Sequence, residues 1–406
     1  MSYRLLRITN FYTEYINHYY IKFPNIKELS YDEQYNHLIN DSIEMVSSYT
    51  KHLIKSGIDA LDIVTNAEQL QQTWAKEHTI SPDTSFKELI TEQIKFYKPD
   101  VLWLDDSRLF NKTWIKHIKS EIPSIKLIAG HICAPYNTEI SNSFSSFDII
   151  FTCIPCMQEE IEKYGVATQL LYHSFDHSIL DTINSEENNA PETNLIFTGS
   201  LYTGYGFHKT RIEYIEKMIE NGIDLKIYGN LESRSKVLLK QTMYYSINFL
   251  KNINCDFLVD TLPVLKNYRN YGGEKITYYS KKLIESVNPP IFGLDMFRVL
   301  SKAKICFNIH GDIAKKCAGN VRLFEVTGVG SCLVTDWKEN LSNLFDVDNE
   351  IVTYKSLNEC IEKIKWLTNN PVEAKKIALS GQKRTLKDHT IENRISIIDS
   401  VLRSKL

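Results

Sequence analysis

Short apolar runs rich in β-branched residues recur along the chain and alternate with segments long enough for helices. In the first half, such runs begin at Tyr3, Ile58, Asp100, Ile125, Phe147 and Thr168. The intervening segments include 31–56, 85–96 and 155–164, each of helical length. Strands that alternate with helices form parallel sheets, because a crossover helix returns the chain to the same end of the sheet. The first half therefore predicts one Rossmann-like domain, residues 1–177.

A second series of the same kind follows an interruption. Residues 178–193 lose the pattern and are rich in Asn, Glu and Ser, which predicts an exposed linker. Strand-like runs resume at Asn194, Asp224, Lys304, Ser331 and Glu350, and the longer segment 232–286 is expected to be mostly helical. A second Rossmann-like domain is predicted for residues 194–389. The last helix, 390–406, follows a complete sheet and is expected to cross back onto the first domain.

The predicted fold class is therefore α/β, with two Rossmann-like domains facing across a cleft. A chain of 406 residues is long enough for two cores of this kind. Open α/β sheets bind ligands at the carboxyl ends of their strands. The cleft between the domains is accordingly the expected active site.

Composition excludes several classes of function. No apolar run approaches the roughly 20 residues that span a bilayer, and MSYRLLRITNFYTEY has no signal-peptide pattern, so we expect a cytoplasmic protein. The formal net charge of -3 gives no reason to expect a nucleic-acid partner. The eight cysteines are expected to be reduced thiols in that compartment.

The common cofactor motifs are not present. No G-x-G-x-x-G follows the first strand of either half, and neither a Walker A loop, a G-x-S-x-G elbow nor an H-E-x-x-H helix occurs. Cys153 and Cys156 form a CIPC sequence, for which redox or zinc chemistry is the alternative to buried thiols. No second cysteine pair has metal-ligand spacing, so buried thiols are the preferred interpretation.

Two segments of the second half could bind an anion. In the run 199–211, GSLYTGYGFHKTR, a strand ends in a turn at Gly199 and a helix begins near His208, Lys209 and Arg211. Amides at a helix start together with cationic side chains suit a diphosphate. The alternative is a solvated basic helix start, and the residues alone do not separate the two.

The second segment is AGNVRLFEVTGVGSCLVTD, residues 318–336. Asn320 is predicted to cap a short helix over 321–327, which places Arg322 in the first turn and Glu325 one turn later on the same side. A carboxylate there can accept two hydrogen bonds from a ribose diol, while Arg322 faces phosphate. The alternative is an exposed ion pair worth a few tenths of a kcal/mol. A glycine-flanked short helix at a sheet edge favours the binding interpretation.

The same residues resemble a known family. The runs NVRLFEVTGVGSCLVTDWKENLSNLF, EIVTYKSLNECIEKIKWL and GQKRTLKDHTIENRI closely resemble the C-terminal domain of group-1 GT-B glycosyltransferases, in particular the spore-maturation-protein-like branch. In the first half, NFYTEYINHYY, SYDEQ, NAEQLQQTWAKE, QIKFYKPDVLWL and HSFDHSIL fit the same branch. The resemblance thus extends over nearly the whole chain.

The resemblance implies that the second domain binds a nucleotide-diphospho-sugar, with Glu325 on the nucleotide ribose. Two departures are notable. Larger group-1 enzymes often have a second glutamate seven residues earlier, where this chain has Ala318. Their Arg and Lys pair after the first strand of this domain is not matched in spacing, so His208, Lys209 and Arg211 are inferred substitutes.

Sugar transfer needs charge stabilisation on the departing diphosphate and, in an inverting enzyme, a base for the acceptor hydroxyl. Helix amides and cations can supply the first, so neither a metal nor another cofactor is expected. The base should stand at the carboxyl end of a strand of the first domain. His131 is the first choice, and the alternatives are Asp105 and Glu14, which is expected with His18 in the loop after the first strand. His310 is expected near the diphosphate or the sugar.

The sequence therefore predicts a metal-independent glycosyltransferase, using a nucleotide-sugar donor and a glycan or lipid-linked acceptor in surface-polysaccharide assembly. The latter role would bring the protein to the inner membrane face as a peripheral contact. Two alternatives remain open: a nucleotide-sugar epimerase of the same architecture, and a non-catalytic nucleotide-sugar-binding subunit.

Overall fold

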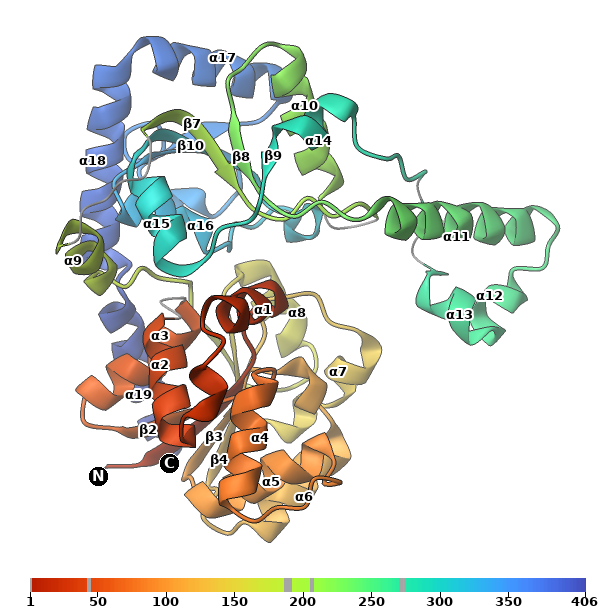
Figure 1. Ribbon diagram of the computed structural model, residues 1–406, viewed down its shortest axis with the longest axis vertical. Coiled ribbons are helices and arrows are strands. Elements are labelled where there is room, and N and C mark those ends of the chain that lie inside the picture. The colour runs from red at the N-terminus through yellow and green to blue at the C-terminus, as the bar shows by residue number, and fades with distance from the viewer. Residues whose placement is uncertain (1, 42–44, 186–191, 205–207, 270–272, 274) are drawn as a thin grey trace.

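The computed structural model describes residues 2–41, 45–185, 192–204, 208–269, 273 and 275–406. Two six-stranded parallel sheets form two domains, one above the other (Figure 1). Within the described ranges, no helix combines the length and the apolar character needed to cross a bilayer. The predicted fold class of two facing Rossmann-like domains is confirmed.

The N-terminal sheet has the strand order β2-β1-β3-β4-β5-β6. Its strands are β1 (Arg4–Thr9), β2 (Asp59–Val64), β3 (Val101–Leu104), β4 (Leu127–His131), β5 (Ile149–Thr152) and β6 (Thr168–Leu170). The accompanying helices are α1 (Thr13–Lys22), α2 (Tyr31–Asp41), α3 (Met45–Lys55), α4 (Glu68–Glu77), α5 (Phe86–Tyr97), α6 (Lys112–Glu121), α7 (Thr138–Asn142) and α8 (Pro155–Glu162).

The C-terminal sheet has the order β12-β11-β10-β7-β8-β9. Its strands are β7 (Thr193–Thr198), β8 (Lys226–Tyr228), β9 (Val287–Asn288), β10 (Ala303–Asn308), β11 (Cys332–Asp336) and β12 (Val352–Tyr354). The helices in the second half of the chain are α9 (Ser178–Ser185), α10 (Lys209–Glu220), α11 (Arg234–Asn252), α12 (Phe257–Thr261), α13 (Pro263–Asn267), α14 (Lys281–Ser286), α15 (Gly293–Ser301), α16 (Arg322–Gly328), α17 (Leu357–Asn369), α18 (Pro371–Asp388) and α19 (Ile391–Lys405).

Burial on both faces explains why the strands are continuous apolar runs. All four residues of β3, VLWL, are buried, and they alternate between two apolar cores on opposite faces of the sheet. Where β1 pairs with β2, Arg7 lies opposite Asp62 and donates two hydrogen bonds of 2.8 and 2.9 Å to its carboxylate. A buried charge is tolerated there because its partner is aligned with it.

The last helix crosses back as predicted. Helix α19 packs against α3, and Ile391, Ile395, Ile398 and Leu402 join the apolar core of the N-terminal domain (Figure 1). Thr390 and Asn393 form a capping box at its start. The C-terminal end of the chain therefore stabilises the N-terminal domain.

Part of the predicted linker is instead a helix. Residues 178–185 form α9, and its Ile179 and Ile183 are buried in the core of the C-terminal domain with residues of α15. Those two side chains, four residues apart on one face, outweigh the polar composition of the segment. The other predicted linker residues are Thr193, which begins β7, Glu192, and 186–191, which lie outside the described residues.

The segment 232–286 is mostly helical, as predicted. It contains α11 to α14, and α11, α12 and α13 form an arm that extends from the body of the C-terminal domain (Figure 1). Ser233 caps α11 by accepting a hydrogen bond from the Lys236 amide. The two-residue strand β9 follows the segment and was not predicted.

The prediction that all cysteines are reduced is wrong for one pair. Cys156, in α8 of the N-terminal domain, forms a disulfide with Cys317 of the C-terminal domain, 161 residues later, across a Cα–Cα distance of 6.2 Å. The CIPC sequence is therefore divided, because Cys153 keeps a free thiol. The disulfide joins the two domains where their sheets face each other.

Candidate active site

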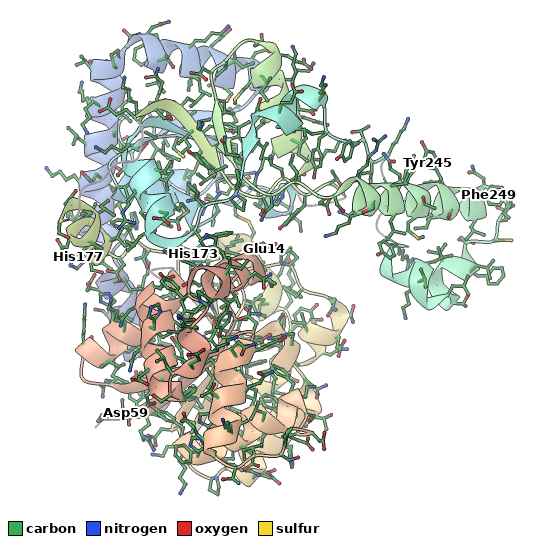
Figure 2. The ribbon with its side chains drawn as sticks, viewed as in Figure 1. Glu14, Asp59, His173, His177, Tyr245 and Phe249 are labelled. Atoms are coloured by element: carbon green, nitrogen blue, oxygen red, sulfur yellow. A yellow bond between two sulfur atoms is a disulfide. The ribbon has the colours of Figure 1, made fainter. Side chains whose placement is uncertain are left out.

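A cavity of about 390 Å³ lies between the domains at the carboxyl end of the C-terminal sheet. Tyr12 and Glu14 line it from the N-terminal domain. The remaining lining residues come from the ends of β7, β8 and β10, from the starts of α10 and α16, from the loop 290–292, and from α15. This is the position that the sequence predicts for the active site, and Figure 2 shows Glu14 where the domains meet.

The pair Arg322 and Glu325 lies in this cavity. Nη1 of Arg322 is 2.7 Å from Oε2 of Glu325, and the two side chains are only 16% and 11% exposed. Nη1 of Arg322 also donates to Sδ of Met296. The pair is therefore not the exposed ion pair that the sequence left as an alternative, because both groups are largely shielded from water.

The predicted cap of this helix is wrong. Helix α16 begins at Arg322, its N-cap residue is Val321, and no side chain caps it. Asn320 instead donates a 2.9 Å hydrogen bond from Nδ2 to Oδ1 of Asn308, at the end of β10. This contact places Asn320 at the edge of the cavity rather than over the helix amides.

Several polar atoms of the cavity are buried without hydrogen-bond partners among the described residues. They are Oγ1 of Thr198, Nε of Arg211 and Oδ1 of Asn320. A buried polar atom without a partner costs about 1–3 kcal/mol. Three such atoms around one cavity indicate a polar ligand that completes their hydrogen bonds.

Arg211 supplies a fixed cation at the cavity. Its Nη1 and Nη2 donate to the backbone oxygens of Ser200 and Ile309 at 2.9 and 2.8 Å. Burial lowers the pKa of its guanidinium to about 10, which leaves it charged at neutral pH. His208 also lines the cavity, but burial and the neighbouring Arg211 lower its pKa to about 3, so its imidazole is neutral.

Glu14 reaches the cavity from the opposite domain. The residue lies in the first turn of α1, not in a loop as predicted, and its Oε1 accepts a 2.9 Å hydrogen bond from the Tyr202 hydroxyl. Tyr202 stacks on His208 with a ring distance of 5.9 Å. Glu14 therefore brings a carboxylate of the N-terminal domain to the donor-side residues.

Two predicted donor residues face a neighbouring groove instead. Lys209 and His310 line it together with Asp312 and Asp336. Nδ1 of His310 lies 2.7 Å from Oδ1 of Asp336, and the Lys209 amide donates to Asp312. Gly199, Asn320, Arg322, Glu325, His208 and Arg211 are thus brought together, whereas Lys209 and His310 are set apart from them.

The other two predicted bases form a buried pair. Nδ1 of His131 lies 2.7 Å from Oδ1 of Asp105, and Nε2 lies 3.1 Å from Sγ of Cys133. Burial alone would lower the pKa of His131, yet the Cys133 sulfur and the Asp105 carboxylate raise it to about 10. Burial opposes the charge of Asp105 too, but His131 holds the pKa of that carboxyl below its ordinary value. Neither residue is among those that line the cavity.

Phe292 was not identified from the sequence as a residue that lines the cavity. Phe292 lines it from the loop after β9, and its ring packs against Tyr15 and His18 of α1 at 6.4 and 6.0 Å. Tyr202, which holds Glu14, was also missed. The run NPPIFG, residues 288–293, was the available signal, because two prolines followed by an aromatic residue at a strand end are typical of a rigid loop.

Comparison with known proteins agrees with this geometry. Residues 251–399 match the family model described as "Glycosyl transferase-like". No curated protein matches the chain in sequence. HepE from Anabaena, whose structure was solved in complex with UDP and glucose, has 11% identity and a TM-score of 0.57, with 99% of this chain and 100% of HepE covered.

Two further solved structures share the fold. Sucrose-phosphate synthase from Thermosynechococcus elongatus has 9% identity and a TM-score of 0.52, with 99% of this chain and 98% of its own covered. A putative UDP-N-acetylglucosamine 2-epimerase from Listeria monocytogenes has 12% identity and a TM-score of 0.51, with 100% and 96% covered. At such identities the likeness shows the two-domain GT-B fold and does not by itself decide the reaction.

Proposed function

We propose that the protein transfers a sugar from a nucleotide-diphospho-sugar to an acceptor hydroxyl, in the cavity between its domains. The observation that carries the proposal is the set of unpartnered polar atoms from Thr198, Arg211 and Asn320, which surround one cavity facing Glu14. The glycosyltransferase-like match over residues 251–399 and the UDP and glucose bound to HepE support it.

The donor is assigned to the C-terminal domain. Glu325 accepts two hydrogen bonds from the nucleotide ribose through the lone pairs of its carboxylate that the ion pair with Arg322 leaves free. Arg211, with its Nε unpartnered, faces the diphosphate and stabilises the charge that develops on it as the bond to the anomeric carbon breaks. Arg322 holds Glu325 in place through the 2.7 Å ion pair. The proposal involves no metal in this step.

Glu14 is the carboxylate best placed for the acceptor side. It lines the same cavity as Glu325, whereas Asp105 and His131 are engaged with each other. In an inverting reaction, Glu14 would take the proton of the acceptor hydroxyl as its oxygen bonds to the anomeric carbon. Its hydrogen bond from Tyr202 ties this carboxylate to the donor-side domain.

The test is binding and turnover with a panel of nucleotide sugars. The purified protein is titrated calorimetrically with each candidate donor, and release of nucleoside diphosphate is then measured with and without acceptor extracts. Acceptor-dependent release supports a transferase. Conversion of the donor sugar without an acceptor would indicate an epimerase, and binding without turnover a binding subunit. If no donor binds, the proposal fails.

We further propose that the acceptor is lipid-linked and that the arm of α11 to α13 contacts the inner membrane surface. Tyr245, Phe249, Phe257 and Val264 are all more than half exposed on this arm, as Figure 2 shows for Tyr245 and Phe249. Exposed aromatic and apolar side chains suit a lipid interface. Lys251 is exposed near Phe249 on the same helix and would favour anionic lipid.

Vesicle flotation tests this contact. The full chain should float with anionic vesicles and not with neutral ones, and the double variant Tyr245→Ser and Phe249→Ser should lose binding. The matched control is Trp366→Ser, an exposed aromatic residue on α17 outside the arm. Equal flotation of both variants would remove the arm from the proposal without affecting the assignment of the cavity.

A further inference from the structure

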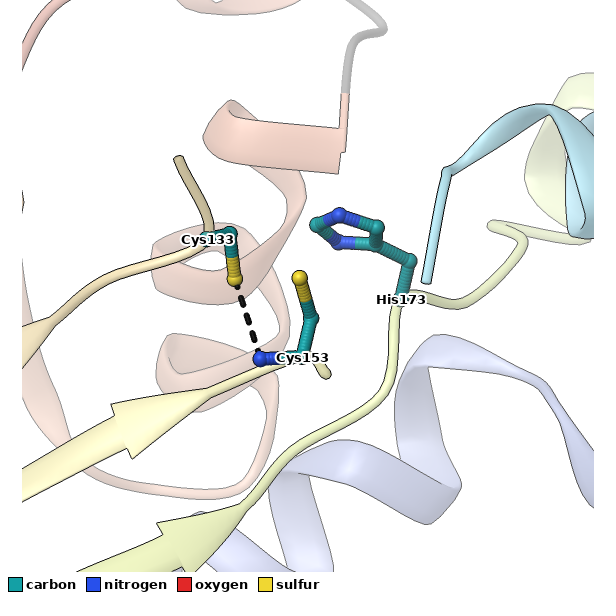
Figure 3. Close-up of side chains that lie close together, drawn as sticks. All are labelled: Cys133, Cys153 and His173. Atoms are coloured by element: carbon teal, nitrogen blue, oxygen red, sulfur yellow. Dashed lines mark hydrogen bonds between the residues drawn. The ribbon is translucent and has the colours of Figure 1, made fainter. Parts of the chain in front are cut away.

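Three potential metal ligands meet at the carboxyl edge of the N-terminal sheet. Cys133 lies two residues after β4, Cys153 directly follows β5, and His173 lies in the loop after β6. These strands are neighbours in the sheet, so parallel pairing brings their following residues together. One ligand atom from each of the three side chains lies within 4.8 Å of the other two (Figure 3).

Two nitrogen atoms contact the sulfur of Cys133. The backbone N–H of Cys153 donates a 3.1 Å hydrogen bond to Sγ of Cys133 (Figure 3). Nε2 of His131 lies 3.1 Å from the same sulfur, and Nδ1 of that ring contacts Asp105 at 2.7 Å. N–H donors next to a ligand sulfur orient it and stabilise its negative charge when a metal ion is bound.

His173 offers a nitrogen without a partner. Its Nδ1 is buried and has no hydrogen-bond partner within the described residues. Figure 3 shows the ring directed towards the two sulfur atoms. The backbone is held from the other side, because Arg394 of α19 donates to the oxygens of Tyr172 and His173 at 2.8 and 3.2 Å. The imidazole is therefore positioned, and a metal ion would satisfy its lone pair.

We infer that Cys133, Cys153 and His173 bind one thiophilic divalent cation, with zinc as the preferred ion. Two sulfurs and one imidazole nitrogen match the ligand softness of zinc, and two thiolates neutralise its charge. Bond lengths of about 2.3 Å to sulfur and 2.0 Å to nitrogen place tetrahedral ligand atoms about 3.5–3.8 Å apart. Small side-chain movements bring the three atoms to that spacing, and a fourth position stays open.

The ion would fix the N-terminal side of the domain contact. The cluster is continuous with the interface, since Gly319 of the C-terminal domain packs so closely on Cys153 and Ile154 that an added Cβ would lie 2.4 Å from Ile154. Gly319 directly precedes Asn320 at the donor cavity. The cation thus ties three strand ends together beside the loop that leads to helix α16. This inference does not depend on the proposed sugar transfer.

Metal titration of the full chain tests the inference. The protein is stripped with a chelator under anaerobic conditions and titrated with Co²⁺, then with Zn²⁺. We expect one equivalent of Co²⁺ with thiolate-to-cobalt charge-transfer absorption and the visible bands of a tetrahedral site, both displaced by Zn²⁺. The absence of stoichiometric binding, a spectrum of oxygen ligands only, or a Cys133–Cys153 disulfide in the stripped protein would each overturn it.

Variants identify the ligands. Cys133→Ser and Cys153→Ser should each remove the charge-transfer band and lower affinity at least about 100-fold, and His173→Gln should lower affinity at least about 10-fold while keeping the band. Cys255→Ser, in which a free thiol of the arm is replaced, is the matched control and should bind as the parent does. Unchanged binding by His173→Gln and by a folded Cys153→Ser, checked by circular dichroism, would overturn the assignment.

Discussion

The carboxyl edges of the two sheets differ in how their polar groups are satisfied. On the C-terminal edge, Thr198 and Asn320 each have a buried oxygen without a hydrogen-bond partner among the described residues. On the N-terminal edge, Asp105 contacts His131 at 2.7 Å, and Asp106 accepts hydrogen bonds of 2.6 Å from both Thr65 and Arg108. One edge has unused hydrogen-bonding capacity, and the other is largely closed by internal contacts.

Whether a polar side chain already has an internal partner distinguishes ligand-binding residues from structural residues better than the type of residue does. His131 ends β4, Asp105 directly follows β3, and Glu14 lies in α1 after β1, and each could act as a base. Two of them form one buried pair, whereas Glu14 lines the cavity with Glu325. Asp105 and His131 contact each other, so the lone pairs that would accept a proton from the acceptor are occupied. We therefore assign these two residues a structural role, and Glu14 is the residue of the N-terminal edge that acts in the cavity.

The largest expected effect comes from removing that carboxylate. Glu14→Gln keeps the size of the side chain and its contact with Tyr202 but cannot accept a proton. A lost general base lowers kcat by about 10²–10⁴-fold, while the Kd of the donor should change little. Rates of nucleoside diphosphate release and calorimetric donor titrations measure the two quantities.

Glu28→Gln, an exposed carboxylate of the same domain, is the control and should keep the parent rate. The comparison between the edges would break if Glu14→Gln kept its rate while a folded Asp105→Asn lost it. Asp105, paired with His131, would then act as the base in place of Glu14.

The sequence allowed the fold to be predicted because parallel strands leave a strong local signal. The VLWL run of β3 is buried on both faces, and its continuous apolar character predicts a central strand. The strand β9, with two residues, is too short to produce such a signal. Helix α9 was missed because Ile179 and Ile183 are buried by distant residues of the C-terminal core, which the local composition does not reveal.

The site was predicted less completely because its geometry depends on distant contacts. The position of Glu325 could be predicted from a short helix at a strand end, and Glu325 does line the cavity. The role of Asn320 as a cap was wrong, since Asn308 of β10 engages its amide. The disulfide between Cys156 and Cys317 spans 161 residues, and no spacing rule would pair them. For Asn320 and for the two cysteines, a partner outside the local segment decides the outcome.

The second largest effect concerns the covalent link between the edges. Cys317→Ser removes the disulfide with Cys156, and loss of such a cross-link costs about 2–4 kcal/mol of unfolding free energy because the unfolded chain gains freedom. Denaturant unfolding without reductant should show this loss against the parent, and excess reductant should abolish most of the difference. Cys255→Ser is the control. A difference that reductant leaves unchanged would mean that packing of Cys317, rather than the cross-link, is what matters.

A smaller effect is expected from the carboxylate of the C-terminal edge. Glu325→Ala should weaken binding of the nucleotide by about 1–3 kcal/mol, roughly 5- to 150-fold in Kd, because hydrogen bonds to a charged acceptor are lost. Calorimetry measures this change. Glu325→Gln, which keeps one acceptor and the packing against Arg322, should lose less. Glu373→Ala, which removes a half-exposed carboxylate of α18 outside the cavity, is the control. Unchanged affinity in Glu325→Ala would leave the pair with Arg322 as a purely structural contact.

The smallest effect is expected at His389, which lies between α18 and α19 where the chain crosses back to the N-terminal domain. The buried His389 lies against Phe324 and Phe345, with Nε2 2.8 Å from the Leu344 oxygen and Nδ1 3.0 Å from Nη2 of Arg394. Nε2–H therefore donates to the carbonyl, and Nδ1 accepts from the guanidinium, which requires a neutral ring. Burial, with the charge of Arg394, lowers the pKa of His389 to about 4 despite the bond to Leu344.

The sign of the pH dependence follows from that neutral ring. Unfolded histidine takes up a proton near pH 6.5, whereas folded His389 does so near pH 4, so its contribution to stability is complete above pH 6.5 and falls as the pH decreases towards 4. Between pH 7 and 5.5, this one group should account for about 1 kcal/mol of lost unfolding free energy. In urea unfolding, the free energy of unfolding of His389→Gln should fall by about 1 kcal/mol less than that of the parent over the same pH interval. An identical pH dependence in the variant and the parent would mean that the pKa of His389 is the same in the folded and unfolded states. Other groups would then cause the loss of stability in acid.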